Sequence, residues 1–81
     1  LEAAAKSITA IEVVAADRRG LLAKLAAAIA ETDIDMRGAN ISTFGEKAVD
    51  VFFVTDRRGS KLDQVQTDLL IQRLHEAAEL N

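Results

Sequence analysis

The fold is decided by residues 44–55, FGEKAVDVFFVT, which predict a turn followed by the clearest strand in the chain. The apolar side chains of Ala48–Thr55 alternate between two faces: Val49, Val51 and Phe53 on one, Phe52 and Val54 on the other. A second strand precedes the turn over Ile34–Thr43, and Gly38 within it indicates a bulge or a close backbone approach. A short connection that contains glycine predicts that these two strands form a hairpin.

A further strand begins at Ile8, upstream of the hairpin. Both of its faces are largely apolar, which predicts a strand that is central in the sheet or covered on both faces. Asp17-Arg18-Arg19-Gly20 ends it, and Thr32-Asp33 ends the helix that follows. The apolar residues of this helix recur at helical spacing, with Leu21 at the margin: Leu22, Leu25, Ala26 and Ile29.

The tetrapeptide Asp-Arg-Arg-Gly occurs again at residues 56–59, between the last strand and a second amphipathic helix. Asp63 followed by Gln66 predicts a helix N-cap with its reciprocal partner. The helix should extend to about Leu80 and bury Val65, Leu69, Leu70, Leu74 and Ala77 or Ala78. The repeat fits the internal pseudo-symmetry of a split β-α-β fold; coincidence is the alternative, because such turns often use Asp and Gly.

The order β-α-β-β-α predicts an α+β sandwich of the split β-α-β type, with two helices on one face of an antiparallel sheet. The usual fourth strand is missing or supplied by another segment. A three-stranded sheet would leave the first strand with an unpaired edge, which is covered by the N-terminal segment, paired with another chain, or exposed. We expect one domain over residues 8–81. Residues 1–7 are expected to be a linker, either a spacer derived from engineering, because Glu2–Lys6 is EAAAK, or a natural alanine-rich segment.

Composition excludes several classes of function. The 81 residues contain no cysteine, which removes disulfides, zinc ribbons and thiol catalysis. The net charge is −3 and the basic residues are scattered, which argues against binding to nucleic acid or to an anionic membrane. The aromatic residues are three phenylalanines, and no base-stacking strand signature surrounds them: Phe44, Phe52 and Phe53.

Catalytic and metal-ligating patterns are also lacking. His75 is the single histidine, and with Glu76 and Glu79 beside it on one helix it is expected to face solvent. Asp33 and Asp35 are expected to be solvated. The three serines have no histidine and aspartate pattern around them: Ser7, Ser42 and Ser60. We therefore expect no catalytic residue, no metal and no cofactor in this chain.

The first Asp-Arg-Arg-Gly turn is the candidate binding site. Helix N-termini present unpaired N–H groups to carboxylates, and Gly20 lets a ligand approach the backbone. Asp17 offers an acceptor for an amino group, and Arg18 or Arg19 offers a donor. An amino acid, which carries both charges on one carbon, would suit this turn; a plain turn with Asp17 as the helix cap is the alternative.

Residues 11–22, IEVVAADRRGLL, resemble the opening of an ACT domain, a small module that senses amino acids. Residues 39–56, ANISTFGEKAVDVFFVTD, are similar to the C-terminal ACT domain of bifunctional PII uridylyltransferase/uridylyl-removing enzymes. The resemblance covers about Ile8–Leu80 and implies a ferredoxin-like ACT sandwich. The family has proline where this chain has Arg19; proline would preorganise the turn, so the difference bears on affinity.

The resemblance implies regulation by glutamine in a cytoplasmic enzyme of nitrogen control, with the PII protein a partner through the parent enzyme alone. ACT domains pair with a second ACT domain, in cis or in a homodimer, and hold the ligand between them. Carried over by position, the ligand-binding residues are Asp17, Arg18, Gly20, Leu21, Leu22, Asn40 and Ser42. The alternatives are a pairing module that binds no ligand and an engineered scaffold.

Overall fold

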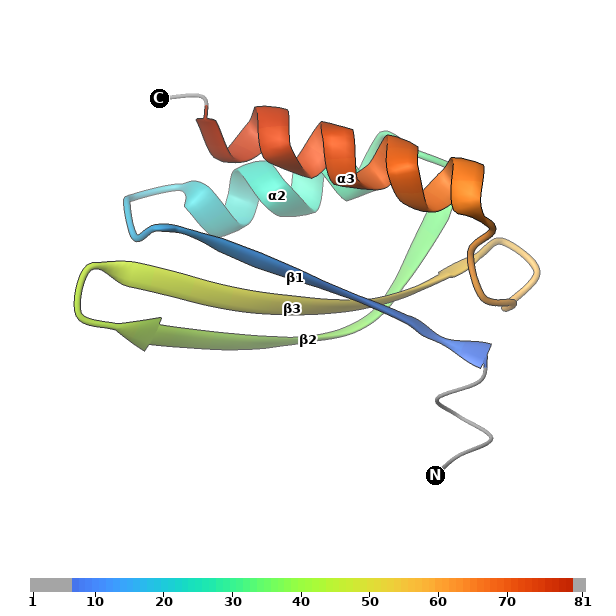
Figure 1. Ribbon diagram of the computed structural model, residues 1–81, viewed down its shortest axis with the longest axis horizontal. Coiled ribbons are helices and arrows are strands. Elements are labelled where there is room, and N and C mark those ends of the chain that lie inside the picture. The colour runs from blue at the N-terminus through green and yellow to red at the C-terminus, as the bar shows by residue number, and fades with distance from the viewer. Residues whose placement is uncertain (1–6, 80–81) are drawn as a thin grey trace.

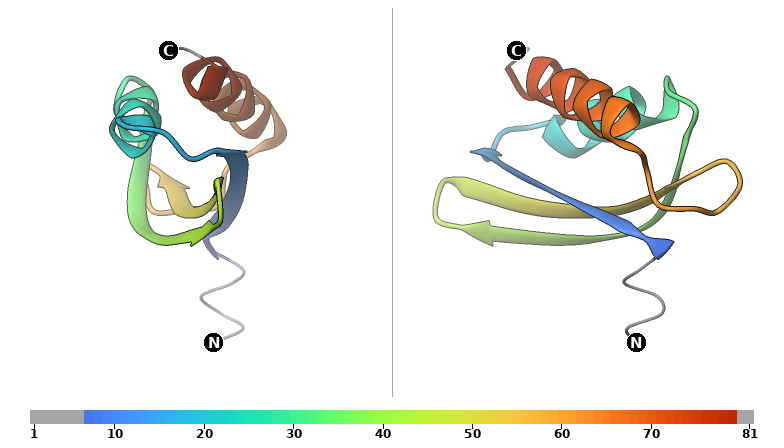
Figure 2. Two further views of the ribbon diagram at one scale, coloured as in Figure 1. Left: turned by 90° about the vertical axis from the view of Figure 1, so that its left-hand side faces the viewer. Right: turned by 45° about the vertical axis from the view of Figure 1, so that its right-hand side comes forward.

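The computed structural model describes residues 7–79, which form two helices on one face of a three-stranded antiparallel sheet (Figure 1). The strand order in the sheet is β1-β3-β2. The elements follow one another along the chain as β1 (Thr9–Ala16), α2 (Leu21–Ala30), β2 (Ile34–Phe44), β3 (Lys47–Asp56) and α3 (Gln64–Glu79). The predicted α+β order is confirmed, and the two layers are seen end-on in Figure 2. The predicted linker lies outside the described residues, apart from Ser7.

The hairpin that joins β2 to β3 has a two-residue turn, because Phe44 pairs with Lys47. Gly45 occupies the first turn position with φ 63°, a left-handed conformation that glycine adopts without strain. The predicted bulge is also present: the register shifts between Met36 and Gly38, so Arg37 has no partner in the β2–β3 ladder. An extra residue of this kind exchanges the faces of all the residues that follow it.

The core lies between the sheet and the helices. Phe52 and Val54 of β3 are fully buried on the helix-facing side. Their partners are the residues that α2 and α3 bury: Leu21, Leu25, Ala28 and Ile29 from α2, and Leu70, Leu74 and Ala77 from α3. The central strand therefore supplies the floor of the core, and both helices close it.

The sequence prediction for β1 is wrong in one respect. The strand lies at an edge of the sheet, and its residues on the face away from the helices are exposed: Ala10, Glu12, Val14 and Ala16. Only its other face, with Ile11 and Val13, packs on the core. The described residues leave this outer face of β1 uncovered. Its apolar side chains therefore do not indicate a central position in the sheet.

The buried faces of both helices are rotated relative to the prediction. Leu21 is buried whereas Leu22 is 45% exposed, because α2 begins at Leu21 and its buried stripe starts there. In α3, Val65 and Leu69 are 77% and 44% exposed, so the buried stripe is narrower than the apolar one. Helical spacing defines a stripe, but the crossing of helix and sheet decides which part of it is covered.

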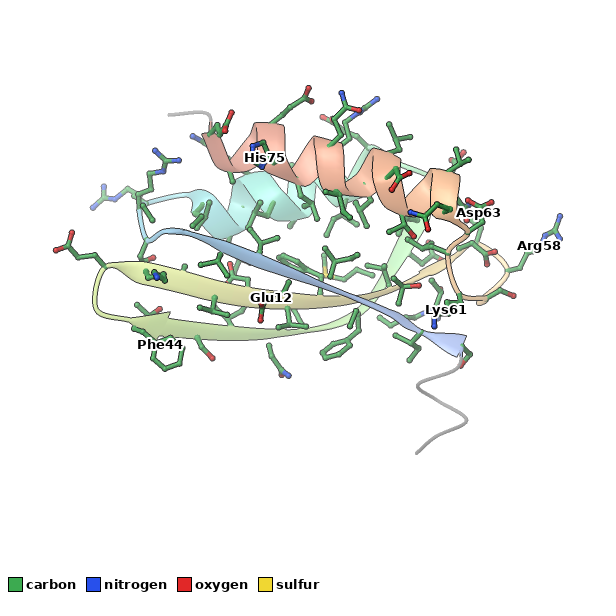
Figure 3. The ribbon with its side chains drawn as sticks, in the orientation of Figure 1. Glu12, Phe44, Arg58, Lys61, Asp63 and His75 are labelled. Atoms are coloured by element: carbon green, nitrogen blue, oxygen red, sulfur yellow. The ribbon has the colours of Figure 1, made fainter. Side chains whose placement is uncertain are left out.

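Phe52→Ala should destabilise the protein by about 3–5 kcal/mol, because it opens a cavity in the floor of the core. Phe44→Ala is the matched control: that ring is 66% exposed and points away from the helices (Figure 3), so its loss should cost about 0.5 kcal/mol or less. Urea unfolding measures both values. Equal losses in the two variants would contradict this assignment of the core.

Candidate functional site: the N-terminus of α2

The turn between β1 and α2 is held to the hairpin and begins the helix without a side chain. The Asp17 N–H donates to the Glu46 carbonyl at 2.7 Å, which ties the turn to the hairpin end. Gly20 is the N-cap residue, with φ 82° and ψ 0°, and no side chain caps the helix. The alternative in which Asp17 is the helix cap is therefore wrong.

An uncapped N-terminus leaves backbone donors available to a ligand. The Leu21 N–H donates to Arg18 O at 3.1 Å, and the first helical bond runs from Lys24 N to Gly20 O at 3.0 Å. The N–H groups of Leu22 and Ala23 lie between these two and have no acceptor within the helix. A Cβ atom at Gly20 would meet nothing within 4 Å, and no acidic residue lies in the first turn. This end of α2 can accept a carboxylate.

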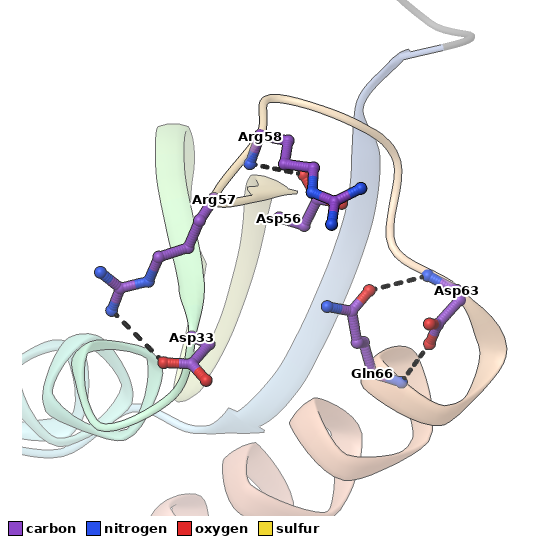
Figure 4. Close-up of a pocket in the computed structure, with 6 residues that line it drawn as sticks. All are labelled: Asp33, Asp56, Arg57, Arg58, Asp63 and Gln66. Atoms are coloured by element: carbon purple, nitrogen blue, oxygen red, sulfur yellow. Dashed lines mark hydrogen bonds and ion pairs between the residues drawn. The ribbon is translucent and has the colours of Figure 1, made fainter.

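The second Asp-Arg-Arg-Gly turn has a different structure. Asp56 Oδ1 accepts from the N–H groups of Arg58 and Ser60, at 2.9 and 2.8 Å, so this turn is closed by its own aspartate. The helix that follows has the predicted capping box: the Gln66 N–H donates to Asp63 Oδ1 at 2.7 Å, and the Asp63 N–H donates to Gln66 Oε1 at 3.0 Å (Figure 4). Identical sequences thus give one closed turn and one uncapped helix end.

The hollow beside this second turn, about 630 Å³, has most of its polar groups engaged. Asp56 and Asp63 bind backbone N–H groups, and Arg57 lies 3.6 Å from Asp33, an exposed pair (Figure 4). We therefore place the candidate site at the first turn, where backbone donors face outward without a cap.

Arg18 extends away from the helix end that it precedes. Its Nη2 donates to the carbonyl of Ala78, near the C-terminal end of α3. A cation at this position also interacts favourably with the negative end of the α3 dipole. Arg18, predicted as a ligand residue, thus links the turn to α3, while Arg19 is exposed.

The register of β2 separates the two groups of predicted site residues. Asn40 pairs with Val51 and Ser42 pairs with Val49, so both lie on the face away from the helices. Asp17, Gly20 and Leu22 are together at the turn, on the helix side, and Leu21 is in the core. Within one chain the structure therefore does not bring Asn40 and Ser42 to the turn.

The helix-facing residues of the same part of β2 were missed by the sequence analysis. Ile41 and Thr43 pair with Asp50 and Ala48, both of which belong to the helix-facing row of β3. The sign in the sequence was the bulge at Arg37. Before the bulge the even-numbered residues of β2 share the face of the helices, and after it they lie on the opposite face of the sheet.

Asp50 is the other residue that was missed. It is 2% exposed, on the helix side of the central strand, and its Oδ1 has no hydrogen-bond partner. The residues opposite it in the two ladders, Val13 and Ile41, are apolar. Burial, followed by the negative charge of Asp17, raises the pKa of the Asp50 carboxyl. The signal in the sequence was a carboxylate within a strand whose alternate residues are apolar.

Comparison with known proteins identifies the family. A family model described as "ACT domain" matches residues 9–79. The chain belongs to the ACT domain family. The resemblance inferred from the turn and hairpin sequences is thereby confirmed.

The curated relatives of this ACT domain are long enzymes. The chain is 46% identical over 77 residues to the bifunctional uridylyltransferase/uridylyl-removing enzyme of Novosphingobium aromaticivorans, a match over 94% of the chain and 8% of that protein. It is 44% identical over 71 residues to the enzyme of that name from Vibrio atlanticus, with 88% and 8% covered. For the Pseudomonas putida enzyme the identity is 42% over 77 residues, with 95% and 8% covered. The chain thus spans about a twelfth of the length of these relatives.

No three histidine, cysteine or carboxylate side chains among residues 7–79 are placed to hold a metal ion. His75 is exposed and lies 3.0 Å from Glu79. Neither described helix is long and apolar enough to cross a membrane.

The two Asp-Arg-Arg-Gly turns should respond differently to the same substitution. Asp56→Ala should destabilise the protein by about 1–2 kcal/mol, because two backbone N–H groups lose their acceptor. Asp17→Ala, in which no cap is lost, should cost about 0.5 kcal/mol or less. Thermal or urea unfolding of the pair measures this difference, and a larger loss in Asp17→Ala would show that the first turn is capped after all.

Asp50→Asn should change how stability depends on pH. The pKa of Asp50 is raised above its ordinary value of 3.8 in the folded state, so the folded protein retains a proton that the unfolded chain has released. The free energy of unfolding of the wild type therefore falls as the pH rises from 3.8 through the folded-state pKa of Asp50. The variant has no titrating group at this position, so its free energy of unfolding lacks this decrease.

Urea unfolding at about pH 4 and about pH 7 gives the test. The free energy of unfolding of Asp50→Asn, relative to wild type, should be higher at the higher pH. Asp33→Asn removes one charge from a side chain that is 94% exposed and controls for the change in net charge. A difference for Asp50→Asn that is constant or falls with pH would contradict the burial of an unpaired carboxyl.

Proposed function

We propose that this ACT domain senses an amino acid, glutamine, and regulates a bifunctional uridylyltransferase/uridylyl-removing enzyme. The observation that carries the proposal is the uncapped N-terminus of α2, whose N–H groups match a carboxylate. The names of the relatives support the parent enzyme, and the resemblance of the turn and hairpin sequences supports glutamine. Catalysis belongs in this proposal to other parts of the cytoplasmic parent enzyme, which alone would contact the PII protein.

The position of the turn suggests how a bound ligand would act on the rest of the domain. The backbone of Asp17 holds the hairpin end, and the side chain of Arg18 holds the C-terminal end of α3. A ligand that orders this turn therefore stabilises one arrangement of both segments. Regulation would follow as a shift between two arrangements of unequal ligand affinity.

A neighbouring ACT domain, in cis or in a second copy, completes the proposed site. Asn40 and Ser42 lie on the opposite face of the same sheet from the turn. They would serve the ligand, as the resemblance implies, only from the domain that pairs with this one.

Addition of L-glutamine should raise the melting temperature and shift the amide resonances of residues 17–23. At a concentration about tenfold above Kd, the ligand contributes about 1.4 kcal/mol, which is about 5–10 °C for a domain of this size. D-glutamine and L-alanine are the controls for specificity. Absence of any response at several millimolar L-glutamine, with the neighbouring ACT domain supplied, would refute glutamine as the ligand.

A ligand-free pairing module is the second candidate, and the free edge of β1 favours it. A groove of about 150 Å³ beside this edge strand is lined by apolar residues of β1 and α3 together with Glu12 and His75. Unpaired strand edges associate readily with other strands. Sedimentation velocity at rising concentration separates the candidates: a dimer that forms equally with and without glutamine supports the pairing module.

A further inference from the structure

One carboxyl oxygen of Asp50, Oδ1, has no hydrogen-bond partner among the described residues. A carboxyl group that is 2% exposed and has an oxygen without a hydrogen bond is costly in a protein interior, whether it is charged or neutral. Nothing in the packing of β3 needs it, because the other helix-facing residues of the strand, such as Phe52 and Val54, fill the core with apolar atoms. A polar group in this state suggests a partner that is absent from the described chain.

The location of Asp50 connects it to the uncapped helix end. Asp50 pairs with Val13, which lies four residues before the turn. The next helix-facing residue of β3 toward the turn is Ala48, which pairs with Ala15 near the end of β1. The negative charge of Asp17, the first residue of the turn, acts on it directly and contributes to its raised pKa. Asp50 therefore lies at the end of the core that adjoins the turn.

The protein cover over this end is thin on the side of β2. Ile41, the neighbour of Asp50 across the ladder, is 48% exposed on the helix-facing side, and Leu22 in the first turn of α2 is 45% exposed. The hairpin continues beyond both helices at this end of the molecule (Figure 1). Ile41 and Leu22 are thus half-exposed apolar residues, the first beside Asp50 in the ladder and the second in the first turn of α2.

We propose that Asp50 accepts the ammonium group of an amino acid whose carboxylate lies at the uncapped N-terminus of α2. This assignment rests on the proposed function and names the residue that distinguishes an amino acid from other carboxylates. The helix end supplies donors for the negative group, and the buried oxygen of Asp50 supplies the acceptor for the positive one. Asp17 is exposed, so solvent screens its attraction for the same ammonium group.

A charged hydrogen bond from the ligand's ammonium group to a buried carboxylate would make the site selective for amino acids. An analogue without the amino group would leave the carboxylate unpaired, and its binding would be weaker. L-glutamine should therefore bind more tightly than 4-carbamoylbutanoate, which has the same carboxylate and amide but no amino group. The loss expected from one such bond is about 10- to 100-fold in Kd.

The experiment is a titration of the 81-residue chain and its variants with these two compounds, in the presence of the neighbouring ACT domain, by calorimetry or amide chemical shifts. Asp50→Asn should weaken the binding of L-glutamine by about 10- to 100-fold and change the Kd of 4-carbamoylbutanoate by no more than about twofold. The variant should therefore lose the preference for L-glutamine. Asp50→Ser is a second variant with a smaller polar side chain, and Asp33→Asn is the control, expected to bind as wild type. Circular dichroism and the unfolding midpoint establish that each variant is folded.

The outcomes distinguish the two proposals. If L-glutamine binds the wild type and Asp50→Asn with equal affinity, Asp50 is not the acceptor, and the sensing function stands without it. The same holds if Asp50→Asn and Asp50→Ser weaken the binding of L-glutamine and of 4-carbamoylbutanoate equally. If the folded wild type binds no L-glutamine with the neighbouring ACT domain present, the proposed function fails, and the role of Asp50 fails with it.

Discussion

The burial of one face of β3 beneath both helices is the constraint on which the rest of the structure depends. Phe52 and Val54 lie on the central strand, paired on both sides, so their burial positions β1 and β2 as well as α2 and α3. A domain of this size buries a modest share of its surface, and its stability therefore depends on few residues. The polar exception in this row, Asp50, is 2% exposed and lies between Phe52 and Ala48, the residue of the row nearer the turn.

Much of this fold could be predicted from the sequence, because local signals and the final structure agree. Alternation in β3, glycine at the hairpin and the Asp63–Gln66 pair each act over a few residues and each was confirmed. The edge position of β1 and the exposure of Leu22 could not be predicted in this way. They depend on which elements pack together and at what angle, and those are tertiary properties.

The candidate site could be predicted only in part, for the same reason. Its turn is local, and the residues Asp17 and Gly20 were found from their types and spacing. Asp50, which we propose as a further residue of the site, lies on another strand, and a carboxylate among the apolar residues of β3 was its only sign in the sequence. The same tetrapeptide at residues 56–59 shows the limit of local inference, because only the surrounding elements decide whether its aspartate closes the turn.

The bulge at Arg37 has a consequence for how such a site diversifies. One extra residue in β2 decides whether Asn40 and Ser42, or Ile41 and Thr43, share a face with the helices. A deletion or insertion of a single residue at this point would replace the largely apolar pair on the helix side by the polar one without altering any of the four side chains. Ligand preference in this architecture is therefore open to change through the length of one strand, a route that substitution-by-substitution comparison of sequences would overlook.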